Sequence, residues 1–421
     1  MKVYKFGGAS VRHADGVRNL LKIIGDERDL FIIVSAMGKT TNALERVFAG
    51  VQRADREKIA EEIAALRTYH AAIIDDLWHG PTSLPRVDAL FAELEQTTST
   101  ESYRPEDAEL WYDRIVAFGE LISTTIISEY LAYAGVPNRW IDMRRALVTE
   151  QRHKDAEVDL NASAPRLRAE VEGCKERIFV GQGFIGGAPD GTTTTLGREG
   201  SDYSAAVAAN ILDAESMAVW KDVDGVLNAD PKIFPDAVQI AELNYLDTIE
   251  LAYSGAQIIH PRTIKPLQNK NIPLYVRPFG DKRKPGTVIR GMSAPVDVPI
   301  LILKKDQVLL TIRSRDFSFV LEEKFAAIFA LLELFRVKAN LIHNSAVNLS
   351  LCVDDSWHID EAVAALRAEG FDVMKIERME LLTVRGYTEE LWRRHACGPQ
   401  VFIRQATQST VRIVRKAETR Q

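Results

Sequence analysis

The sequence predicts an α/β fold in which an open, mainly parallel sheet carries helices on both faces and is followed by α+β modules. Three observations lead to this prediction. Short apolar segments alternate with amphipathic segments of helical period over residues 1–292. Proline, glycine and charged residues mark a boundary over 278–299, and beyond it the order becomes strand, helix, strand, strand, helix, strand. Alternating strands and helices favour a parallel sheet, because each parallel connection needs a crossover that covers one face.

The elements of the first domain, 1–292, follow in order. The chain opens with a strand at 3–6, a helix over about 11–24 and a strand at 30–35. Residues from about 42 to 130 are mostly helical by pattern and form a layer or a lid. The other expected strands are 137–141, 177–180, 216–221 and 273–277, and the other expected helices are 201–212 and 246–259.

The region 299–421 predicts two smaller modules. The first module, 307–376, has strand 308–314, helix 321–336, strands 340–344 and 347–354, helix 359–369 and strand 371–376. The second module combines 299–305 with 377–421 and has strands at 379–385, 401–406 and 410–414 with one helix at 388–395. Its missing strand can come from 299–304.

The composition excludes several classes of protein. The 421 residues suffice for two or three domains, and 46% hydrophobic with 27% charged residues is typical of a soluble globular chain. A net charge of −6 gives no basic surface for nucleic acid or acidic lipid. The three cysteines, Cys174, Cys352 and Cys397, indicate neither disulfides nor a zinc site. We expect a cytoplasmic protein that acts on small molecules, without a secretion signal or a membrane-spanning segment.

The segment from Gly181 to Asp202 is the most informative part of the chain. It combines glycines, four consecutive threonines at 192–195 and Arg198 between a strand and a helix. Glycines let backbone N–H groups approach an anion, and the N-terminus of a helix favours negative charge, so the segment predicts a phosphate site. Residues 181–186 also match the G-x-G-x-x-G dinucleotide fingerprint. We reject a nicotinamide site, because the threonines separate these glycines from the helix.

Four other polar segments lie elsewhere in the sequence. Lys5-Phe-Gly-Gly-Ala-Ser10 places a lysine and two glycines between a strand and a helix, and residues 34–42 place hydroxyls in a similar turn. Residues 220–232 hold three aspartates around a turn, and 118–121 carries one carboxylate in an apolar stretch. Each of the three turn segments alone also fits an ordinary capped turn or a solvated loop, and burial of the carboxylate in 118–121 would be costly without a cation or a donor. Their coincidence favours a ligand site, because open α/β sheets bind ligands at the carboxyl ends of their strands.

The sequence shows neither a nucleophile–histidine system nor a histidine or cysteine metal site. No serine–histidine or cysteine–histidine system is evident, and the eight histidines have no metal-ligand spacing. His260 precedes a proline and is expected at a helix end. We therefore expect no metal site built by the protein alone.

Taken together, these motifs resemble those of the aspartate kinases, within the amino acid kinase family, from Lys2 to about Ile289. The tail is similar to the paired ACT modules of those enzymes, which have the ferredoxin-like βαββαβ order. The segments that carry the resemblance are Lys5-Phe-Gly-Gly8, Val34-Ser-Ala-Met-Gly38, Gly181-Gln-Gly-Phe-Ile-Gly-Gly187, Thr193-Thr-Thr-Leu-Gly-Arg198, Gly200-Ser-Asp-Tyr203, Asp222-Val-Asp-Gly-Val226, Ala229-Asp-Pro231, Gly255-Ala256 and His260-Pro-Arg-Thr-Ile264.

The resemblance implies the amino acid kinase fold for 1–292 and phosphoryl transfer from Mg-ATP to the side-chain carboxylate of L-aspartate. The product, 4-phospho-L-aspartate, opens lysine, threonine and methionine biosynthesis. A carboxylate is already ionised at neutral pH, so no general base is needed. The obstacle is bringing two anions together, which lysine charge, Mg²⁺ and N–H donors can overcome.

The resemblance also implies a role for individual residues. Lys5 would stabilise the transferring phosphoryl group, and Asp202 would organise the catalytic centre. Arg198 would pair with a substrate carboxylate, and Glu120 would take the substrate ammonium. The complete aspartate site would be Ser35, Thr41, Glu120, Arg198 and Ser201. The ATP site would be Lys5, Gly7, Gly8, Ser10, Lys221, Asp222, Leu227, Lys232 and Gln257.

Several residues depart from the family pattern. Ala9 stands where threonine is usual, and Gln257 and Lys232 replace a lysine and an arginine, which predicts weakened nucleotide affinity. Glu199 replaces a common glycine and would cost about 1–2 kcal/mol if its backbone must be left-handed.

The tail departs from the family pattern as well. A lysine-containing segment, 323–326, occupies a helix start that usually bears glycine, and Asn340 and Ala346 replace acidic residues of the effector site. We therefore expect weak or absent inhibition by lysine, and the resemblance still implies an amino-acid effector at the ACT region. ACT sheets commonly pair edge to edge, so the resemblance also implies a homodimer. Two alternatives stay open: a sister amino acid kinase acting on another carboxylate or a nucleotide, and a catalytically impaired amino-acid sensor.

Overall fold

The structure is a computed structural model, and it describes residues 1–98, 103–256, 259–292, 296–315, 322–386 and 400–417. The chain forms two compact units. The first comprises residues 1–226, 241–249 and 258–294, and the second comprises 227–240, 250–257 and 295–421. Neither unit is continuous in sequence, whereas we expected domains at 1–292 and 299–421. The expected division into domains at 1–292 and 299–421 therefore stays a prediction.

The first unit contains an eight-stranded sheet in the order β10-β12-β11-β7-β1-β2-β4-β3. Neighbouring strands are parallel except for β11 and β12. The central strands are apolar on both faces, which is the pattern of a sheet covered by helices. The strands are β1 Lys2–Phe6, β2 Leu30–Val34, β3 Arg139–Ile141, β4 Ile178–Gln182, β7 Ser216–Lys221, β10 Glu242–Asn244, β11 Leu274–Pro278 and β12 Thr287–Arg290.

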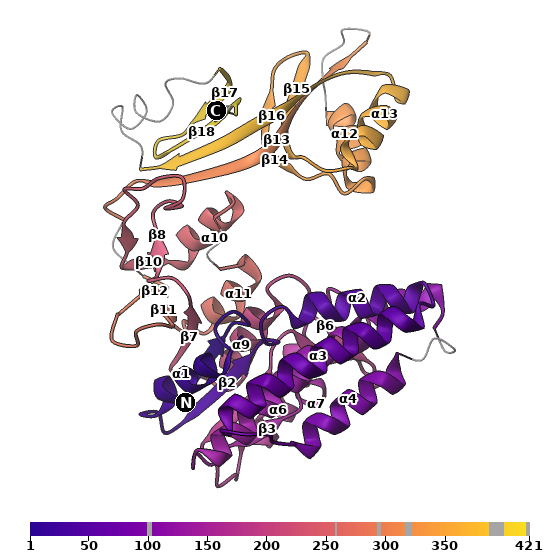
Figure 1. Ribbon diagram of the computed structural model, residues 1–421. Helices are drawn as coiled ribbons and strands as arrows, with labels where there is room; N and C mark the ends of the chain where they lie inside the picture. The colour runs from indigo at the N-terminus through magenta and orange to yellow at the C-terminus, as the bar shows by residue number, and fades with distance from the viewer. Residues whose placement is uncertain (99–102, 257–258, 293–295, 316–321, 387–399, 418–421) are drawn as a thin grey trace. The chain divides into compact units, whose positions relative to one another are not determined.

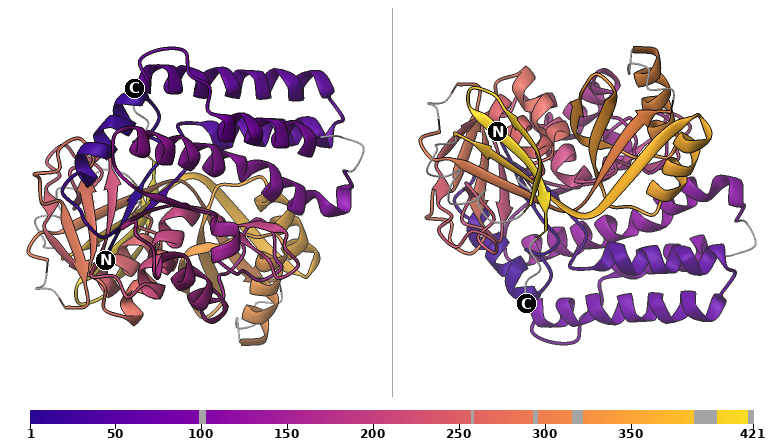
Figure 2. Two further views of the ribbon diagram at one scale, coloured as in Figure 1. Left: turned by 90° about the horizontal axis from the view of Figure 1, so that it is seen from below. Right: turned by 90° about the horizontal axis from the view of Figure 1, so that it is seen from above.

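Two groups of helices pack on this sheet. Helix α9 (Gly200–Ile211) is entirely buried and packs against β1, β2 and β7, whereas α6 (Phe118–Tyr133) packs against β2, β3 and β4. The helices α2–α6, in purple, form the expected layer (Figures 1 and 2). The remaining helices are α1 Ala14–Ile24, α2 Thr40–Gln52, α3 Arg56–Leu77, α4 Pro85–Thr97, α5 Ala108–Val116, α7 Met143–Ala146, α8 Leu160–Val171, α10 Tyr245–Tyr253 and α11 Pro261–Asn269, with a short 3-10 turn at Pro105–Asp107.

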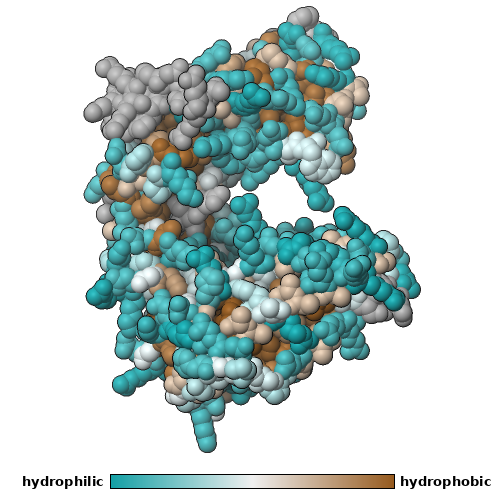
Figure 3. All heavy atoms as spheres, viewed as in Figure 1, coloured by the Kyte–Doolittle hydropathy of each residue, from teal (hydrophilic) through white to brown (hydrophobic). Residues whose placement is uncertain are grey.

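One helical stretch of the described chain, Pro105–Tyr133, is long and apolar enough to cross a membrane. Its most apolar window is 89% buried inside the protein. It therefore serves as a core element, with Leu121, Ile122, Ile126 and Ile127 packed in the main hydrophobic cluster. On the visible surface, hydrophilic residues predominate and hydrophobic residues appear as separate patches (Figure 3).

The second unit contains a six-stranded antiparallel sheet in the order β14-β15-β13-β16-β18-β17. Helices α12 (Glu322–Leu334) and α13 (Ile359–Ala368) follow β13 and β15 along the chain, and their apolar residues share one core with these strands. The strands are β13 Ile300–Ser314, β14 Ala339–Asn344, β15 Asn348–Asp354, β16 Phe371–Arg385, β17 Val401–Ala406 and β18 Thr410–Lys416. Short strands elsewhere are β5 Ile185–Gly187, β6 Thr193–Thr195, β8 Val226–Leu227 and β9 Gln239–Ile240.

The open, mainly parallel sheet covered by helices and the α+β tail are confirmed, with corrections in the connections. The expected helix 246–259 is wrong, because α10 ends at Tyr253 and a new helix starts at Pro261. The strands expected separately at 299–304 and 308–314 form one strand, β13, and those at 371–376 and 379–385 form β16. These two long strands join both modules into one sheet, and residues 300–304 pair with 381–385 as the missing strand. The helix expected at 388–395 lies outside the described residues.

Candidate active site

Lys5 lies at the carboxyl end of the central strand β1, and its side chain meets the first turn of α9. The distance from Lys5 Nζ to Asp202 Oδ1 is 2.6 Å. Both side chains are nearly buried, with 11% and 4% of their surfaces exposed. A buried charge is tolerated when it is paired, so each residue stabilises the other in this position.

Lys221 brings a second ammonium group to the same carboxylate from the end of β7, the strand next to β1. Its Nζ lies 3.8 Å from Asp202 Oδ2. Burial alone would raise the pKa of Asp202, but the two ammonium groups outweigh it and hold this pKa below its ordinary value. Asp202 is therefore ionised at neutral pH, and the three residues carry a net charge of +1. Such a cluster attracts an anion without a bound metal.

The first glycine turn lies beside this cluster. A side chain at Gly8 would place its Cβ 2.4 Å from the carbonyl oxygen of Ala36, so only glycine fits. Ser10 is buried, and its Oγ lies 3.5 Å from both the carbonyl oxygen of Trp220 and Oδ1 of Asp222. The expected helix start near residue 11 is wrong by about one turn, because α1 begins at Ala14. The turn therefore offers Gly7, Gly8 and Ser10 rather than a helix end.

The second turn, after β2, is fixed by Glu120 from the helical layer. The N–H of Ala36 donates to Glu120 Oε1 at 3.0 Å, and Ser123 Oγ donates to the carbonyl of Ser35 at 2.8 Å. Thr41 lies in the first turn of α2. The structure therefore brings the region of Ser35 next to Glu120, as the predicted aspartate site requires.

Glu120 is a buried carboxyl group with spare hydrogen-bonding capacity. Its side chain is 3% exposed, and Oε2 has no hydrogen-bond partner. Burial raises the pKa of Glu120 to about 8, while the N–H of Ala36 and the charge of Lys5 lower it in part. At pH 7 this carboxyl is largely protonated, and a cationic ligand group beside Oε2 would favour its ionised form.

The glycine- and threonine-rich segment forms the third wall of the site. Strands β5 and β6 make a small hairpin, and α9 starts only at Gly200, which supports rejection of a dinucleotide turn. A side chain at Gly183 would place its Cβ 2.5 Å from Cβ of Ser201. This close approach brings the strand end onto the first turn of α9, which carries Ser201 and Asp202.

The turn between β6 and α9 carries Arg198 on its exposed side. Gly197 and Glu199 both adopt left-handed backbone, with φ of 71° and 54°. The condition stated for the cost at Glu199, a left-handed backbone, is therefore met, and its Oε2 accepts a hydrogen bond of 3.0 Å from the N–H of His260. Within the described chain Arg198 makes no ion pair, and its guanidinium is accessible to a ligand carboxylate.

The residues expected at the nucleotide site are divided between the two units, and one of them lies outside the described residues. Lys221 and Asp222 belong to the first unit, and Asp222 is exposed. Leu227 and Lys232 belong to the second unit, where the N–H of Lys232 donates to Asp230 Oδ1 at 2.9 Å. Gln257 lies outside the described residues, so its assignment stays a prediction.

Sequence reasoning missed a group of residues that hold the Arg198 turn. Asp113 of α5 is fully buried and accepts a hydrogen bond from Thr195 Oγ1 at 2.5 Å. Arg262 donates to the carbonyl of Leu196 at 2.8 Å, and His260 caps α11 by accepting from the N–H of Arg262. Little in the sequence pointed to Asp113, because it stands beside Arg114 and one turn after Glu109 and so fits an exposed helix face.

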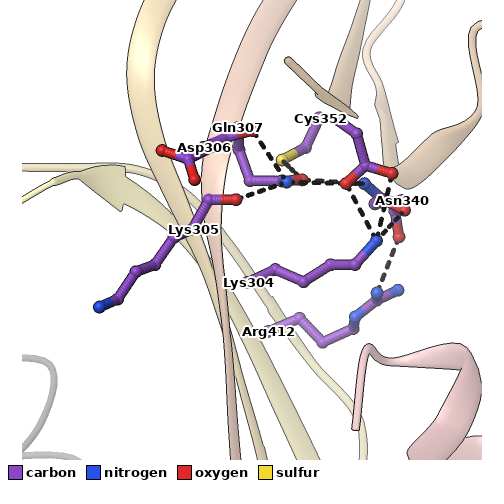
Figure 4. A network of polar contacts seen from close by, with 8 residues as sticks. Lys304, Lys305, Asp306, Gln307, Asn340, Cys352 and Arg412 are labelled. Carbon is purple, nitrogen blue, oxygen red and sulfur yellow. Dashed lines mark hydrogen bonds and ion pairs between the residues drawn. The ribbon is translucent and has the colours of Figure 1, made fainter. Parts of the chain in front are cut away.

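A separate polar cluster lies in the second unit and includes Asn340, which stands where the family pattern has an acidic residue (Figure 4). Lys304 Nζ donates to Asn340 Oδ1 at 2.9 Å and to Asp354 Oδ1 at 3.0 Å. Asn340 Nδ2 donates to Gln307 Oε1 at 2.8 Å and to Asp354 Oδ1 at 2.9 Å. The Asn340 amide is thus 6% exposed and fully engaged within the protein.

Comparison with known proteins identifies relatives of this chain. Residues 1–278 match the model of the amino acid kinase family. The chain is 31% identical to lysine-sensitive aspartokinase 3 of Escherichia coli over 84% of this chain and 78% of that protein. It is 33% identical to the aspartokinase of Chlamydia trachomatis over 73% of this chain and 69% of that protein. Against aspartokinase 1 of Arabidopsis thaliana it is 31% identical and covers 63% of the plant protein.

Solved structures agree with these relatives. The crystal structure of E. coli aspartokinase III with aspartate and ADP matches with a TM-score of 0.82, 26% identity and coverage of 99% of this chain and 96% of that one. The complex of the same enzyme with lysine and aspartate matches with a TM-score of 0.79 and 26% identity, covering 98% and 95%. Fold, site and relatives therefore agree, and the chain belongs to the amino acid kinase family, among its aspartokinases.

Proposed function

We propose that this protein transfers the γ-phosphoryl group of Mg-ATP to the side-chain carboxylate of L-aspartate, with Lys5 and Asp202 as catalytic residues. The buried cluster of Lys5, Lys221 and Asp202 is the observation that carries the proposal. It sets a net charge of +1 where two turns and a helix N-terminus meet at the ends of parallel strands. This is the electrostatic environment that a transferring phosphoryl group requires.

The reaction needs positioning and charge compensation rather than a base. An oxygen of the aspartate side chain attacks the γ-phosphorus, the bond from that phosphorus to the bridging oxygen breaks, and its electron pair leaves with ADP. The pKa of an aspartate side chain lies well below 7, so the attacking carboxylate is already ionised at neutral pH and no proton has to be removed. Lys5 neutralises charge on the transferring group, and Asp202 holds the Lys5 ammonium in place before substrate arrives.

Two groups orient the amino acid. Arg198 pairs with a substrate carboxylate, since it is exposed and free of ion pairs in the described chain. Glu120 accepts the substrate ammonium on Oε2, the buried oxygen without a partner. Ser35, Thr41 and Ser201 complete the site with hydroxyl groups. Glutamate, one methylene longer, would shift its reacting carboxylate relative to these two anchors.

Mg²⁺ enters this scheme as part of the nucleotide substrate. In the described part of the chain no group of three or more His, Cys, Asp or Glu side chains is placed to hold a metal ion. Mg²⁺ keeps several waters and needs only one or two carboxylates beside the phosphates. Asp222 is exposed next to Ser10 and is suited to that role. Nucleotide contacts by Gly7, Gly8, Lys221, Leu227, Lys232 and Gln257 belong to the same proposal.

The second unit is assigned to assembly and regulation. A homodimer is proposed from the resemblance to enzymes whose ACT sheets pair edge to edge. The β14 edge is already partly engaged, because Arg412 donates to the carbonyl of Asn340 and Gln405 donates to the carbonyl of Ile342. The engaged Asn340 amide and the exposed Ala346 support weak lysine sensitivity. The free cysteines Cys174 and Cys352 are compatible with a cytoplasmic location. Light scattering after gel filtration tests the dimer.

The proposed activity is tested by trapping the acyl phosphate with hydroxylamine. The reaction contains Mg-ATP with L-aspartate, L-glutamate or acetylglutamate in parallel, and the Asp202→Ala variant serves as the blank. We expect hydroxamate with aspartate alone and none from the variant. Product with another acceptor would indicate a sister kinase. No product from any acceptor, together with aspartate binding in calorimetry, would indicate a sensor.

A further inference from the structure

The turn that carries Arg198 is held on both sides by side chains outside the proposed substrate contacts. On one side, Thr195 Oγ1 donates to the buried carboxylate of Asp113 at 2.5 Å. On the other side, Arg262 donates to the carbonyl of Leu196 at 2.8 Å and Glu199 accepts from His260. An exposed arginine therefore projects from a turn whose flanking residues are fixed.

Asp113 contacts the segment at 153–154 as well as strand β6. The N–H of Lys154 lies 3.2 Å from Asp113 Oδ1 and 3.1 Å from Oδ2, and His153 Nδ1 lies 2.8 Å from Oδ2. Lys154 has a left-handed backbone with φ of 66°, an unfavourable conformation for a residue with a side chain. The segment then returns to β6, since the N–H of Ala156 donates to the carbonyl of Thr195 at 3.0 Å.

The same carboxylate is linked through its own helix to the other end of the aspartate site. Asp113 lies in α5, which runs into α6 with only Ala117 between them, and Glu120 is in the first turn of α6. The bond from Asp113 to Thr195 thus joins the segment that bears Glu120 to the segment that bears Arg198. These two residues are the proposed anchors for the ammonium and a carboxylate of one small substrate.

We propose that Asp113 is a positioning residue that sets the spacing between Glu120 and Arg198 through its hydrogen bond to Thr195. This inference rests on the proposed function. A carboxylate suits the task because it accepts from the Thr195 hydroxyl and from the N–H of Lys154, and it can accept from the His153 ring in the tautomer that carries the proton on Nδ1. The isosteric amide would turn an NH₂ group toward one of these donors and lose that contact.

Loss of the hydrogen bond between Asp113 and Thr195 should change the KM for aspartate rather than the KM for Mg-ATP. Loosening the turn by a fraction of an ångström should raise the KM for aspartate by about 10- to 100-fold, because anchors on separate segments must act at a fixed distance. The KM for Mg-ATP should change by less than about 2-fold, since no proposed nucleotide contact lies on this turn. Glu109→Gln, an exposed acidic residue of the same helix, is the matched control and should leave both constants unchanged.

Substitutions at Thr195 separate positioning from packing. Thr195→Val keeps the shape and removes the hydroxyl, whereas Thr195→Ser keeps the hydroxyl and removes a methyl group. We expect the valine variant to reproduce the rise in aspartate KM and the serine variant to restore the wild-type value. Asp113→Asn combined with Thr195→Val should be no worse than the poorer single variant, because both remove one interaction.

The experiment measures both KM values, kcat and the thermal midpoint for the full-length wild type and each variant. Wild-type hydroxamate formation with an unchanged aspartate KM in Thr195→Val would overturn the inference and leave the proposed function intact. Equal losses in the serine and valine variants would also overturn it, since that result indicates packing. If Asp113→Asn does not fold, the two Thr195 variants still decide the question. Absence of product from the wild type would refute the proposed function instead.

Discussion

Lys5 and Asp202 form an ion pair of 2.6 Å between elements far apart in the sequence, the first strand and the helix that follows the glycine- and threonine-rich segment. The pair holds the Lys5 ammonium at a nearly buried position at the carboxyl end of β1. Because Lys221 also faces Asp202, removal of Lys5 leaves the carboxylate with a single, more distant partner. Under the proposed mechanism, catalysis and local stability therefore depend on the same contacts.

Lys5→Ala should reduce kcat by a factor of about 100 to 1,000, the range for loss of one preorganised transition-state donor. Aspartate binding should survive, because Arg198 and Glu120 remain. Turnover and calorimetric binding are measured together, with Lys2→Ala as the control on the same strand, since Lys2 pairs with Glu27 at the opposite end. Retention of most activity in Lys5→Ala would refute the assigned role.

Aspartate binding should release a proton near pH 7 through Glu120. Burial raises the pKa of this carboxyl to about 8, so it is mostly protonated in the free enzyme, and the substrate ammonium favours its ionised form. Affinity for aspartate should therefore rise between pH 6.5 and pH 8.5, a window about the raised pKa. Calorimetry in two buffers of different ionisation enthalpy counts the proton. Equal apparent enthalpies in both buffers would contradict the role of Glu120.

The same group predicts a pH dependence of stability. Since the pKa of Glu120 rises from 4.5 to about 8 on folding, the native state binds more protons than the unfolded chain between these values. Its contribution to stability is full below pH 4.5 and is lost as the pH rises toward 8. Glu120→Gln should flatten this part of the profile in urea unfolding. Glu129→Gln, in the same helix but less buried, should keep the wild-type slope.

The sequence predicted the sheet well because its strands are apolar on both faces and bounded by glycine turns. Strand β7 matches its expected range, and β1, β2 and β4 differ by one or two residues. The helix expected through 246–259 failed because apolar spacing alone did not reveal that Gly255, with φ of 110°, leaves the helical conformation. The continuity of β13 was missed because lysines and Asp306 in its middle read as a break, whereas a bulge there keeps the strand paired.

The sequence singled out Lys5, Asp202 and Glu120, and the structure places Lys5 against Asp202 and Glu120 beside the turn after β2, while their roles stay predictions. Asp113 was missed because its partners, Thr195 and Lys154, are distant in sequence and only the fold unites them. The glycine usually found at position 199 did reveal a backbone property, since Glu199 is left-handed. A departure from the family pattern is informative when the family residue is required by the backbone conformation, as glycine is at a left-handed position.

The left-handed Glu199 gives a prediction about stability. Glu199→Gly and Glu199→Ala both lose the hydrogen bond to His260, but only alanine retains a Cβ in the left-handed region. Glu199→Gly should therefore be more stable than Glu199→Ala by about 1 kcal/mol. Urea unfolding measures the difference. An alanine variant at least as stable as the glycine variant would show that the backbone at 199 is not strained in solution.

Lysine should be a poor effector, and restoring an acid at residue 340 should not make it a good one. Asn340 Nδ2 donates to two acceptors, Gln307 Oε1 and Asp354 Oδ1, so Asn340→Asp would place a carboxylate against both. The amide-to-acid change should destabilise the protein by about 1–3 kcal/mol, the usual cost of lost buried hydrogen bonds.

Ala346→Glu lies on an exposed turn and should be nearly neutral for stability, which makes it the matched control. The lysine Kd should stay weaker than about 1 mM in the wild type and in Asn340→Asp, because the Lys304 ammonium already occupies the Asp354 carboxylate. Calorimetric titration with lysine and inhibition of the hydroxamate reaction measure this. Tight lysine binding by the wild type would mean that a cationic ligand is held by residues other than this cluster.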